Sequence, residues 1–434
     1  MALEFVNDAI SLSGLTGSKL KCEVIGEYYP FWWNITSGGE SANHDLPTAI
    51  VELDAATGEV YIQDTKETIL GSSGHALDLK CSDPNTTRKL KVILVEKDAD
   101  CYKHLKNVIR RRWSNIDIKL AEGPIYSNSS NIYLLNSELD KALNTIEKIR
   151  LGNALFFFDP LRSVQFQTIE KIARNRIKTC YETGTEFIIF VFTSDWFLGR
   201  DDFVGLPDTV DETAWTLQEK RTVLEADALF GNTEWRDHIL NKNPVYEREE
   251  RLIELYRHRL HKWFRYVLPM PFNPKINQIF HLILCSNFAT GVRATRNFYC
   301  EKTSNPKYTP DNRTAFSEFR KLHPETFKGL SRNRRPLQWL MLWRIIVGHE
   351  EGVCDYICSD FEDIEQSEEK RQQLLEWLEK NGYLNPCEKD DAWKLPIKQY
   401  KLNWADIRQK LGIGPPPPFK PLSLKPLSIK EISQ

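Results

Sequence analysis

Acidic side chains stand at the ends of three apolar, strand-like runs in this sequence. They are Glu52 and Asp54 in AIVELDAATGEVY, Glu96 in KLKVILVEK, and Asp159, followed by Pro160, in NALFFFDP. In an open α/β sheet, ligands bind outside the carboxyl ends of the strands, where the strand order reverses. Carboxylates at that place accept hydrogen bonds from hydroxyl and amino groups. The spacing therefore predicts a ligand site at one edge of a sheet, lined by these acids.

The first of these runs fits the loop of a nucleotide-binding sheet. The acid-x-Gly-x-Gly-x-Gly pattern of the first βα turn matches in register at Glu52, Asp54, Ala56 and Gly58. Only the last of the three glycines, Gly58, is present, and glycine there lets the backbone approach a ligand closely. We therefore predict Glu52, Asp54 and Gly58 as cofactor-binding residues. An ordinary turn that closes a strand is the alternative.

Glu96 has a position that suits one specific contact. A carboxylate at the end of the second strand can accept hydrogen bonds from both ribose hydroxyls of an adenosyl group. We therefore predict that Glu96 binds the cofactor. In the alternative interpretation, Glu96 caps the helix that opens at Asp98 or is merely solvated. The sequence leaves both interpretations open.

The segments around these acids alternate between strand-like and helical patterns. Near-continuous apolar runs cover 48–55, 89–97, 117–121, 153–160 and 186–195. Helical patterns separate these runs, and such alternation is typical of a parallel sheet buried on both faces.

Two later runs predict a change of strand direction. Residues 265–272 and 278–287 lie too close in sequence for a parallel crossover, so they must pair antiparallel. The expected fold class is α/β: a class I methyltransferase-like, Rossmann-type sheet of seven strands with a terminal antiparallel hairpin. A plain dinucleotide-binding domain lacks that hairpin. The arrangement favours S-adenosyl-L-methionine (SAM) as the cofactor.

Asp159 and Pro160 take on a specific meaning in such a fold. In methyltransferases that act on amino groups, an Asp-Pro pair here offers a carboxylate and a backbone carbonyl to the target nitrogen, which needs positioning more than a strong base. We therefore predict both residues as catalytic. Leu161 and Arg162 stand where the motif usually has proline or an aromatic residue, so a turn or helix N-cap is the alternative.

The composition limits the classes of partner. The 434 residues carry a formal net charge of −2, which gives no global attraction to nucleic acid or membrane. No apolar run reaches the roughly 18 residues of a membrane span, and the N-terminus lacks a signal-peptide pattern. The nine scattered cysteines fit reduced thiols. We expect a cytoplasmic protein with no membrane partner. We also expect no metal site, because Cys354, Cys358 and Cys387 lack zinc-site spacing.

Changes in composition divide the chain into five parts. We predict an N-terminal helical segment (1–46), a methyltransferase-like Rossmann domain (47–301), a basic linker (302–335), a small winged-helix-like α+β domain (336–400) and a Pro-rich tail (401–434).

The basic linker offers the best local contact for nucleic acid. Residues 302–335 contain nine Lys or Arg against three Asp or Glu and end in SRNRR. We predict Arg332, Arg334 and Arg335 as nucleic-acid-binding residues, because phosphate contacts need clustered cations. A solvated linker without a partner is the alternative.

The series of motifs resembles one protein family. The segments KLKCEVIGEYYPFWWNI, VELDAATGEVY, GSSGHAL, VILVEKD and FFFDP occur in the order found in the three-Cys-motif partner (TcmP) proteins, as do LEADALFGNTEWRDHI and HLILCSNFATGVRATRNFY. The resemblance covers roughly 19–306. It implies a class I SAM-dependent methyltransferase fold with a C-terminal winged helix, a radical-SAM-like three-cysteine partner protein, and an association with mobile elements and antiviral defence against phage.

Carried over by position, the resemblance gives roles to the same residues. Glu52 and Glu96 are the acids of the first and second strands, and Gly58 is the last glycine. The Asp-Pro pair at 159 and 160 is the catalytic pair. Ala56 replaces a glycine of the family pattern, and Leu161 replaces a proline or aromatic residue. Two hypotheses follow: a SAM-dependent methyltransferase-like protein acting on nucleic acid with a partner protein, or a catalytically degenerate fold serving as a binding or scaffold subunit of a defence complex.

Overall fold

The chain divides into two compact units, which are described separately. A computed structural model describes residues 4–12, 16–38, 46–63, 65–82, 89–114, 132–149, 151–158, 165–179, 184–192, 205–240, 245–264, 266–272, 280–288, 291, 295, 298–299, 310–330, 335–350, 368–386 and 400–412. The first unit comprises Met1–Pro271 and Asn277–Val292, and the second comprises Phe272–Ile276 and Arg293–Gln434.

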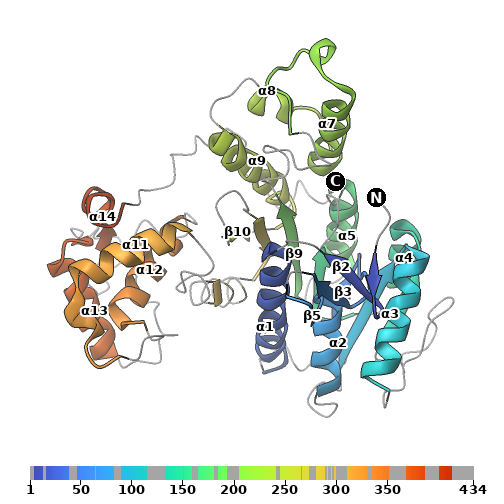
Figure 1. The fold of residues 1–434 in the computed structure, drawn as a ribbon, viewed down its shortest axis with the longest axis horizontal. Helices are drawn as coiled ribbons and strands as arrows, with labels where there is room; N and C mark the ends of the chain where they lie inside the picture. The colour runs from blue at the N-terminus through green and yellow to red at the C-terminus, as the bar shows by residue number, and fades with distance from the viewer. Residues whose placement is uncertain are drawn as a thin grey trace. The chain divides into compact units, whose positions relative to one another are not determined.

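The first unit is built on one large sheet (Figure 1). Its seven strands have the order β10-β11-β9-β8-β3-β6-β7. Their bounds are β3 Thr48–Glu52, β6 Leu90–Glu96, β7 Ile132–Asn136, β8 Ala154–Phe158, β9 Thr185–Phe192, β10 Tyr266–Phe272 and β11 Phe280–Ser286. Strands β7, β6, β3, β8 and β9 pair in parallel, whereas β11 runs antiparallel to β9. The strand order reverses at β3, which lies between β6 and β8.

Apolar side chains explain why these segments form a covered sheet. Every residue of β6, β8 and β11 is buried. A strand buried at each position has other elements packed on both of its faces, which is the pattern of a sheet in an α/β fold. The prediction of a mixed α/β fold around a central sheet is therefore confirmed. The strand expected at 117–121 lies outside the described residues, and β7 was not predicted.

The described part of the first unit also contains eight α-helices and one 3-10 turn. They are α1 Thr16–Gly38, α2 Ser72–Ser82, α3 Ala99–Arg112, α4 Leu139–Ile146, α5 Phe166–Thr179, η2 Glu212–Ala214, α7 Leu217–Phe230, α8 Trp235–Ile239 and α9 Val245–Leu260. Helices α1 and α2 pack side by side (Figure 1). No helix among the residues that the structure describes has both the length and the apolar stretch needed to cross a membrane.

Local sequence signals fix the start of α3, the helix that follows β6. Asp98 precedes the helix, and its carboxylate accepts hydrogen bonds from the N–H groups of Asp100 and Cys101. This satisfies donors that a helix N-terminus leaves unpaired. Arginines 110, 111 and 112 occupy the last turn, where positive charge is favourable. The helix is therefore anchored at both ends.

A second, smaller sheet was not predicted. It has the order β1-β2-β4-β5, with β1 Phe5–Val6, β2 Ala9–Leu12, β4 Glu59–Ile62 and β5 Glu67–Leu70. The segment 1–46 was predicted to be helical, and α1 agrees with that, but residues 5–12 form strands. Strand β2 pairs in parallel with β4, so the N-terminus joins a hairpin that begins just after β3.

The second unit is mainly helical. It contains α11 Pro310–Leu322, η3 Pro324–Phe327, α12 Leu337–Glu350, α13 Glu368–Lys380, β12 Leu384–Pro386, β13 Tyr400–Leu402 and α14 Trp404–Leu411. Strand β12 follows α13 closely and pairs antiparallel with β13. Phe319 of α11 packs against the rings of Trp339, Trp377 and Tyr383. Residues 310–330 were assigned to a linker from the sequence; in the structure they form a helix and a 3-10 turn that contribute to this core.

Candidate functional site

Glu52 and Glu96 lie at the same edge of the large sheet. Each is the last residue of its strand, and the two strands, β3 and β6, are parallel neighbours. Glu52 pairs with Leu94, so Glu96 lies two residues further along. The strand order reverses beside them, which is where ligands of open α/β sheets bind. The expectation that both acids lie at one edge of the sheet agrees with this strand pairing. Their role in binding a cofactor stays a prediction.

Asp159 and Pro160 lie outside the described residues. The strand before them, β8, ends at Phe158 and pairs in parallel with β3, with Phe157 opposite Glu52. The pair therefore follows a strand that ends at the same edge. Its catalytic role remains a prediction.

Glu52 is held by two hydroxyl groups from neighbouring helices. The Tyr29 hydroxyl of α1 donates to Oε1 at 2.5 Å, and the Ser72 hydroxyl at the start of α2 donates to Oε2 at 2.8 Å. Only 1% of Glu52 is exposed. A buried carboxylate needs such donors, because an unpaired one would lose its hydration without compensation. Nothing in the sequence pattern indicated this hydrogen bond from Tyr29.

Glu96 is held by backbone N–H groups from both sides. Oε2 accepts from Ala56 at 2.7 Å, and Oε1 accepts from Asp98 at 2.8 Å. Burial raises the pKa of Glu96, and the hydrogen bonds from Asp98 and Ala56 oppose that rise. Two carboxylate oxygens offer about four acceptor positions, so two remain for other donors. The contact with Asp98 supports the capping interpretation, yet Glu96 keeps enough acceptors for two ribose hydroxyls.

The loop after β3 has the backbone that the glycine pattern requires. Ala56 has φ +50° and Gly58 has φ +77°. Ala56 therefore adopts a conformation typical of glycine, at a cost of about 1–2 kcal/mol. A Cβ at Gly58 would lie 2.9 Å from Leu105 Cδ1, so a larger residue there would have to displace the end of the Leu105 side chain. Asp54 is half-buried in the same turn.

The Gly-rich segment 71–74 packs against the loop that contains Gly58. The β4–β5 hairpin lies between these two segments in the sequence. The N–H of Gly71 donates to the carbonyl oxygen of Gly58 at 3.0 Å. A Cβ at Gly74 would lie 2.1 Å from that same oxygen, so the two backbones touch. The Ser73 hydroxyl donates to the carbonyl oxygen of Ala55 at 2.5 Å. The loop is thus one structure made from two segments, with the hairpin inserted between them.

The predicted nucleic-acid-binding residues are only partly described. Arg332 and Arg334 lie outside the described residues. Arg335 lies in the second unit, with its guanidinium 4.4 Å from the centre of the Phe316 ring of α11. Burial, and then the nearby positive charge of Arg320, lower the pKa of Arg335. The positive charge of Arg320 therefore acts on the guanidinium of Arg335.

Another buried acid, Glu186 of β9, was not predicted as a site residue. It accepts hydrogen bonds from Trp32 Nε1 at 2.6 Å and from the Ser286 hydroxyl at 2.8 Å. Burial raises its pKa. A Cβ at Gly291 would lie 2.2 Å from Glu186 Oε1, so the surroundings of this carboxyl are closely packed. Its partners come from distant parts of the chain, which no local pattern reveals.

Within the described residues, no group of three or more His, Cys, Asp and Glu side chains could hold a metal ion. Cys354, Cys358 and Cys387 lie outside those residues.

Solved structures that are similar to this chain share little sequence identity with it. No protein-family model matches the chain, and no curated protein matches its sequence. The solved structure of protein LPL1258 from Legionella pneumophila has 12% identity and a TM-score of 0.34, over 63% of this chain and 89% of that one. Trm1 from Pyrococcus horikoshii, in complex with SAM, has 10% identity and a TM-score of 0.34, over 68% of this chain and 64% of that one.

A human methyltransferase 10 domain containing protein matches with 9% identity and a TM-score of 0.27, over 61% of this chain and 83% of that one. At these TM-scores the likenesses add nothing to the strand order and contacts given above. The resemblance to the three-Cys-motif partner proteins remains a prediction.

Proposed function

We propose that this chain is a SAM-binding, class I methyltransferase-like protein. The observation that carries the proposal is the position of Glu52 and Glu96 at the ends of adjacent strands, beside a loop that has positive φ at Ala56 and Gly58. The antiparallel strand β11 beside β9 also agrees with the seven-stranded methyltransferase arrangement. These features together suit an adenosyl cofactor at the point where the strand order reverses.

The residues at this edge have distinct roles in the proposal. Glu96 accepts the ribose hydroxyls with the two acceptor positions that Ala56 and Asp98 leave. Glu52 holds the start of α2 through Ser72, and so fixes the second half of the loop. Bound SAM would supply a methyl group on a sulfonium centre. Asp159 and Pro160 would orient the acceptor amine, since transfer depends on alignment.

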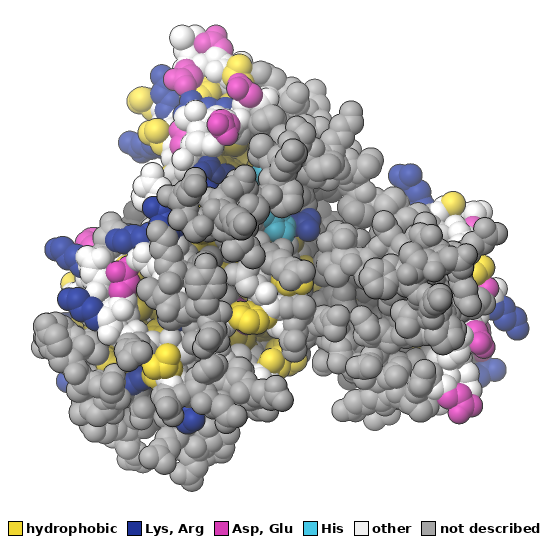
Figure 2. Space-filling model, turned by 180° about the vertical axis from the view of Figure 1, so that it is seen from behind, with side chains coloured by type: hydrophobic (Ala, Val, Ile, Leu, Met, Phe, Trp, Pro, Cys, Tyr) yellow, Lys and Arg dark blue, Asp and Glu magenta, His cyan; other side chains and the backbone are white. Residues whose placement is uncertain are grey.

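We further propose that the methyl acceptor is a nucleic acid, which the second unit helps to bind. Helix α13 followed by the β12–β13 pair gives the element order of a winged helix. In Figure 2, the described Lys and Arg side chains are interspersed with Asp and Glu on the visible face, so attraction must come from local clusters such as Arg320 and Arg335. A three-cysteine radical-SAM-like partner and a role in antiviral defence are supported by the sequence resemblance alone.

One observation favours a second candidate function, that of a binding or scaffold subunit without catalysis. Both oxygens of Glu52 already accept hydrogen bonds from the chain itself, and the Ala56 N–H is taken by Glu96. A site whose polar groups are satisfied internally is stable without a ligand. This candidate differs from the first in one measurable property, the affinity for the cofactor.

Calorimetry with S-adenosylhomocysteine (SAH) tests the proposal. We expect micromolar binding to the wild-type chain and a loss of at least about 100-fold in Glu96→Ala, because two hydrogen bonds to a charged acceptor disappear. Asp100→Ala is the matched control, since Asp100 is an exposed acid in the first turn of α3. Its affinity should stay within about threefold. No heat at millimolar SAH would favour the scaffold function.

A gel-shift titration at several salt concentrations tests the nucleic-acid contact. Arg335→Ala should weaken binding and reduce the salt slope by about one unit, as expected for one lost phosphate contact. Arg335→Lys keeps the charge and should keep the slope. Lys380→Ala, at the exposed end of α13 in the same unit, is the control for general loss of charge. An unchanged slope in Arg335→Ala would exclude this residue from the interface.

A further inference from the structure

The N-terminal residues 5–12 reach the loop that would hold the cofactor. Strand β2 lies parallel to β4, with Ile10 opposite Val60. Strand β4 begins at Glu59, directly after Gly58. The N-terminal hairpin is therefore attached to the strand that leaves the loop. We call residues 5–12 the N-terminal strap.

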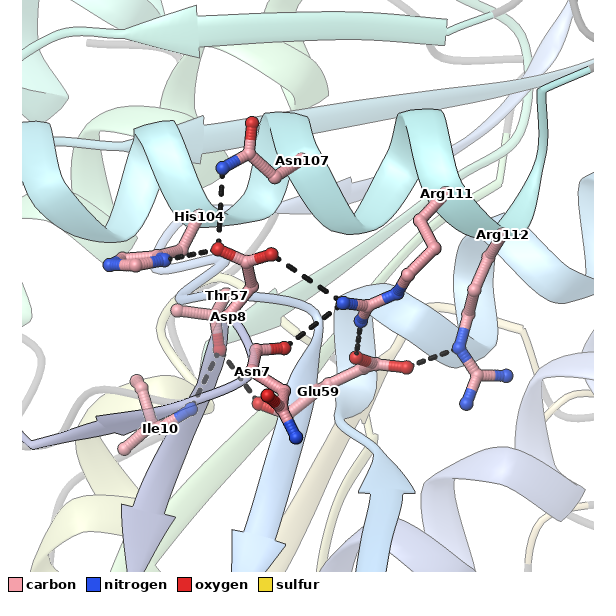
Figure 3. Close-up of polar contacts among 9 residues, drawn as sticks. All are labelled: Asn7, Asp8, Ile10, Thr57, Glu59, His104, Asn107, Arg111 and Arg112. Atoms are coloured by element: carbon pink, nitrogen blue, oxygen red, sulfur yellow. Dashed lines mark hydrogen bonds and ion pairs between the residues drawn. The ribbon is translucent and has the colours of Figure 1, made fainter.

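One hydrogen bond joins the strap directly to the loop. The N–H of Ile10 donates to the Thr57 hydroxyl oxygen at 3.2 Å, and that hydroxyl donates to the carbonyl oxygen of Glu59 at 2.7 Å (Figure 3). Thr57 is fully buried and stands between Ala56 and Gly58, the two residues with positive φ. The contact therefore joins the strap to the loop between its two residues with positive φ.

The turn of the strap is fixed on helix α3. Asn7 and Asp8 have φ +48° and +69°, a conformation that Asn and Asp tolerate better than most residues. Asp8 Oδ1 lies 2.7 Å from His104 Nδ1 and accepts from Asn107 Nδ2 at 3.2 Å (Figure 3). Arg111 donates to the carbonyl oxygen of Asn7 at 3.0 Å. The turn thus places its carboxylate where three side chains of one helix converge.

Further contacts attach the strap and β4 to the same helix. The ring of Phe5 stacks on His104 with 4.1 Å between ring centres. Glu59, only 2% exposed, forms ion pairs with both Arg111 and Arg112 (Figure 3). Charge-assisted pairs of a buried carboxylate are the stronger kind of hydrogen bond. Several contacts therefore join the strap and β4 to α3.

Helix α3 links these contacts to the other half of the site. It starts at Ala99, directly after Asp98, whose N–H donates to Glu96. Its Leu105 lies against Gly58. The strap consequently holds both groups that would meet an adenosyl cofactor: the 56–58 loop through Thr57, and Glu96 through α3.

We propose that the N-terminal strap regulates this site by holding the 56–58 loop and Glu96 in the cofactor-binding arrangement, with Asp8 and Thr57 as its positioning residues. This inference rests on the proposed function. Docking of the strap and binding of the cofactor are then coupled, so each strengthens the other by the same factor. The strap does not touch the acceptor, and its loss weakens cofactor binding rather than the transfer step.

The test combines calorimetry with hydrogen exchange on the full chain. Asp8→Asn keeps the shape of the side chain but removes its charge, and Thr57→Val removes the hydroxyl that joins strap and loop. We expect each to weaken SAH binding about tenfold and to speed amide exchange in residues 53–58 of the free protein. In the wild-type chain, SAH should slow exchange in residues 5–12.

Asp211→Asn is the matched control, because Asp211 also caps a short turn, through the N–H and hydroxyl of Thr213, in the segment 205–240. It should change neither SAH affinity nor exchange in the loop. If the wild-type chain binds SAH and neither strap variant alters affinity or loop exchange, the strap has no positioning role and the proposed function stands. If the wild-type chain binds no SAH, the proposed function fails together with the coupling.

Discussion

Glu96 and Glu186 are both buried carboxyls of the large sheet, and burial raises the pKa of each. They differ in place and partners. Glu96 ends its strand and accepts from two backbone N–H groups, whereas Glu186 is the second residue of β9 and accepts from the side chains of Trp32 and Ser286. Glu186 therefore lies among closely packed residues. Glu96 lies at the end of its strand, at the edge where open α/β sheets bind their ligands. A raised pKa alone does not identify a binding site; position and remaining acceptors do.

The largest expected effect is a loss of folding stability when Glu186 is replaced. Glu186→Ala should lower the free energy of unfolding by about 3–4 kcal/mol, because it leaves a cavity and two buried donors without partners. Urea denaturation measures this loss. The SAH affinity of the folded variant should stay within about twofold of the wild-type value. Glu186→Gln, which keeps the shape, is the control, and a loss below about 1 kcal/mol in Glu186→Ala would contradict our account of its packing.

The variant Tyr29→Phe tests whether Glu52 serves mainly in packing, as Glu186 does, or in ligand binding, as we propose for Glu96. Glu52 lies at a strand end, as Glu96 does, but side-chain hydroxyls hold it, as they hold Glu186. Loss of the Tyr29 hydroxyl should cost about 1–2 kcal/mol of unfolding free energy, since a buried acceptor loses one donor. We expect SAH affinity to change less than about threefold. A larger loss of affinity in calorimetry would place Glu52 in direct contact with the cofactor.

The pH dependence of SAH binding should depend on Glu96 alone. Its raised pKa means that it protonates at a higher pH than an ordinary Glu, and protonation removes acceptors for the ribose. Affinity should therefore fall on acidification, by up to about tenfold per pH unit below that pKa. The free energy of unfolding changes in the opposite direction. Glu96 binds its proton more readily in the folded state than in the unfolded state, so stability falls as pH rises through the folded pKa.

Two variants check this assignment in calorimetry between pH 7 and 5. Glu96→Gln should flatten the pH profile of SAH affinity, whereas Glu186→Gln should leave the profile unchanged. If both variants flatten it equally, the difference between the two acids is not one of ligand contact.

Ala56→Gly should have the smallest effect. The φ of +50° disfavours alanine, whereas glycine adopts it freely but loses more entropy on folding. We expect a net stabilisation of about 0.5–1 kcal/mol. Calorimetry should show equal or tighter SAH binding, since the N–H donor to Glu96 is retained. A variant that binds at least tenfold more tightly would show that the Ala56 methyl group itself obstructs the site.

Residues that follow local rules could be predicted from the sequence. Apolar runs in β3, β6, β8 and β11 identified the sheet, because strands buried on both faces need apolar residues at every position. The acids Glu52 and Glu96 could be placed at one edge, because parallel strands end together. Helix α1, Thr16–Gly38, likewise lies in the N-terminal segment that was predicted to be helical.

Features made by distant residues could not be predicted. Strands β1 and β2 contain two and four residues, too few for a periodic signal, and they exist because β4 supplies a partner. Tyr29, as the donor to Glu52, is identified only once α1 is placed on the sheet. The pattern at 52–58 has one glycine of three, and Gly74, whose backbone touches that of Gly58, comes only after the hairpin.

The inserted hairpin also has a practical use. The Gly71 N–H donates to the Gly58 carbonyl oxygen at 3.0 Å, so the two ends of the hairpin segment lie close together. Lengthening the loop at the tip of such a hairpin lowers folding stability little, by about 0.6 kcal/mol for each doubling of loop length. A reporter peptide grafted near Lys66, where φ is +52° in the turn between β4 and β5, would therefore leave the large sheet intact. Its signal would report motions of the 56–58 loop from a site outside the large sheet.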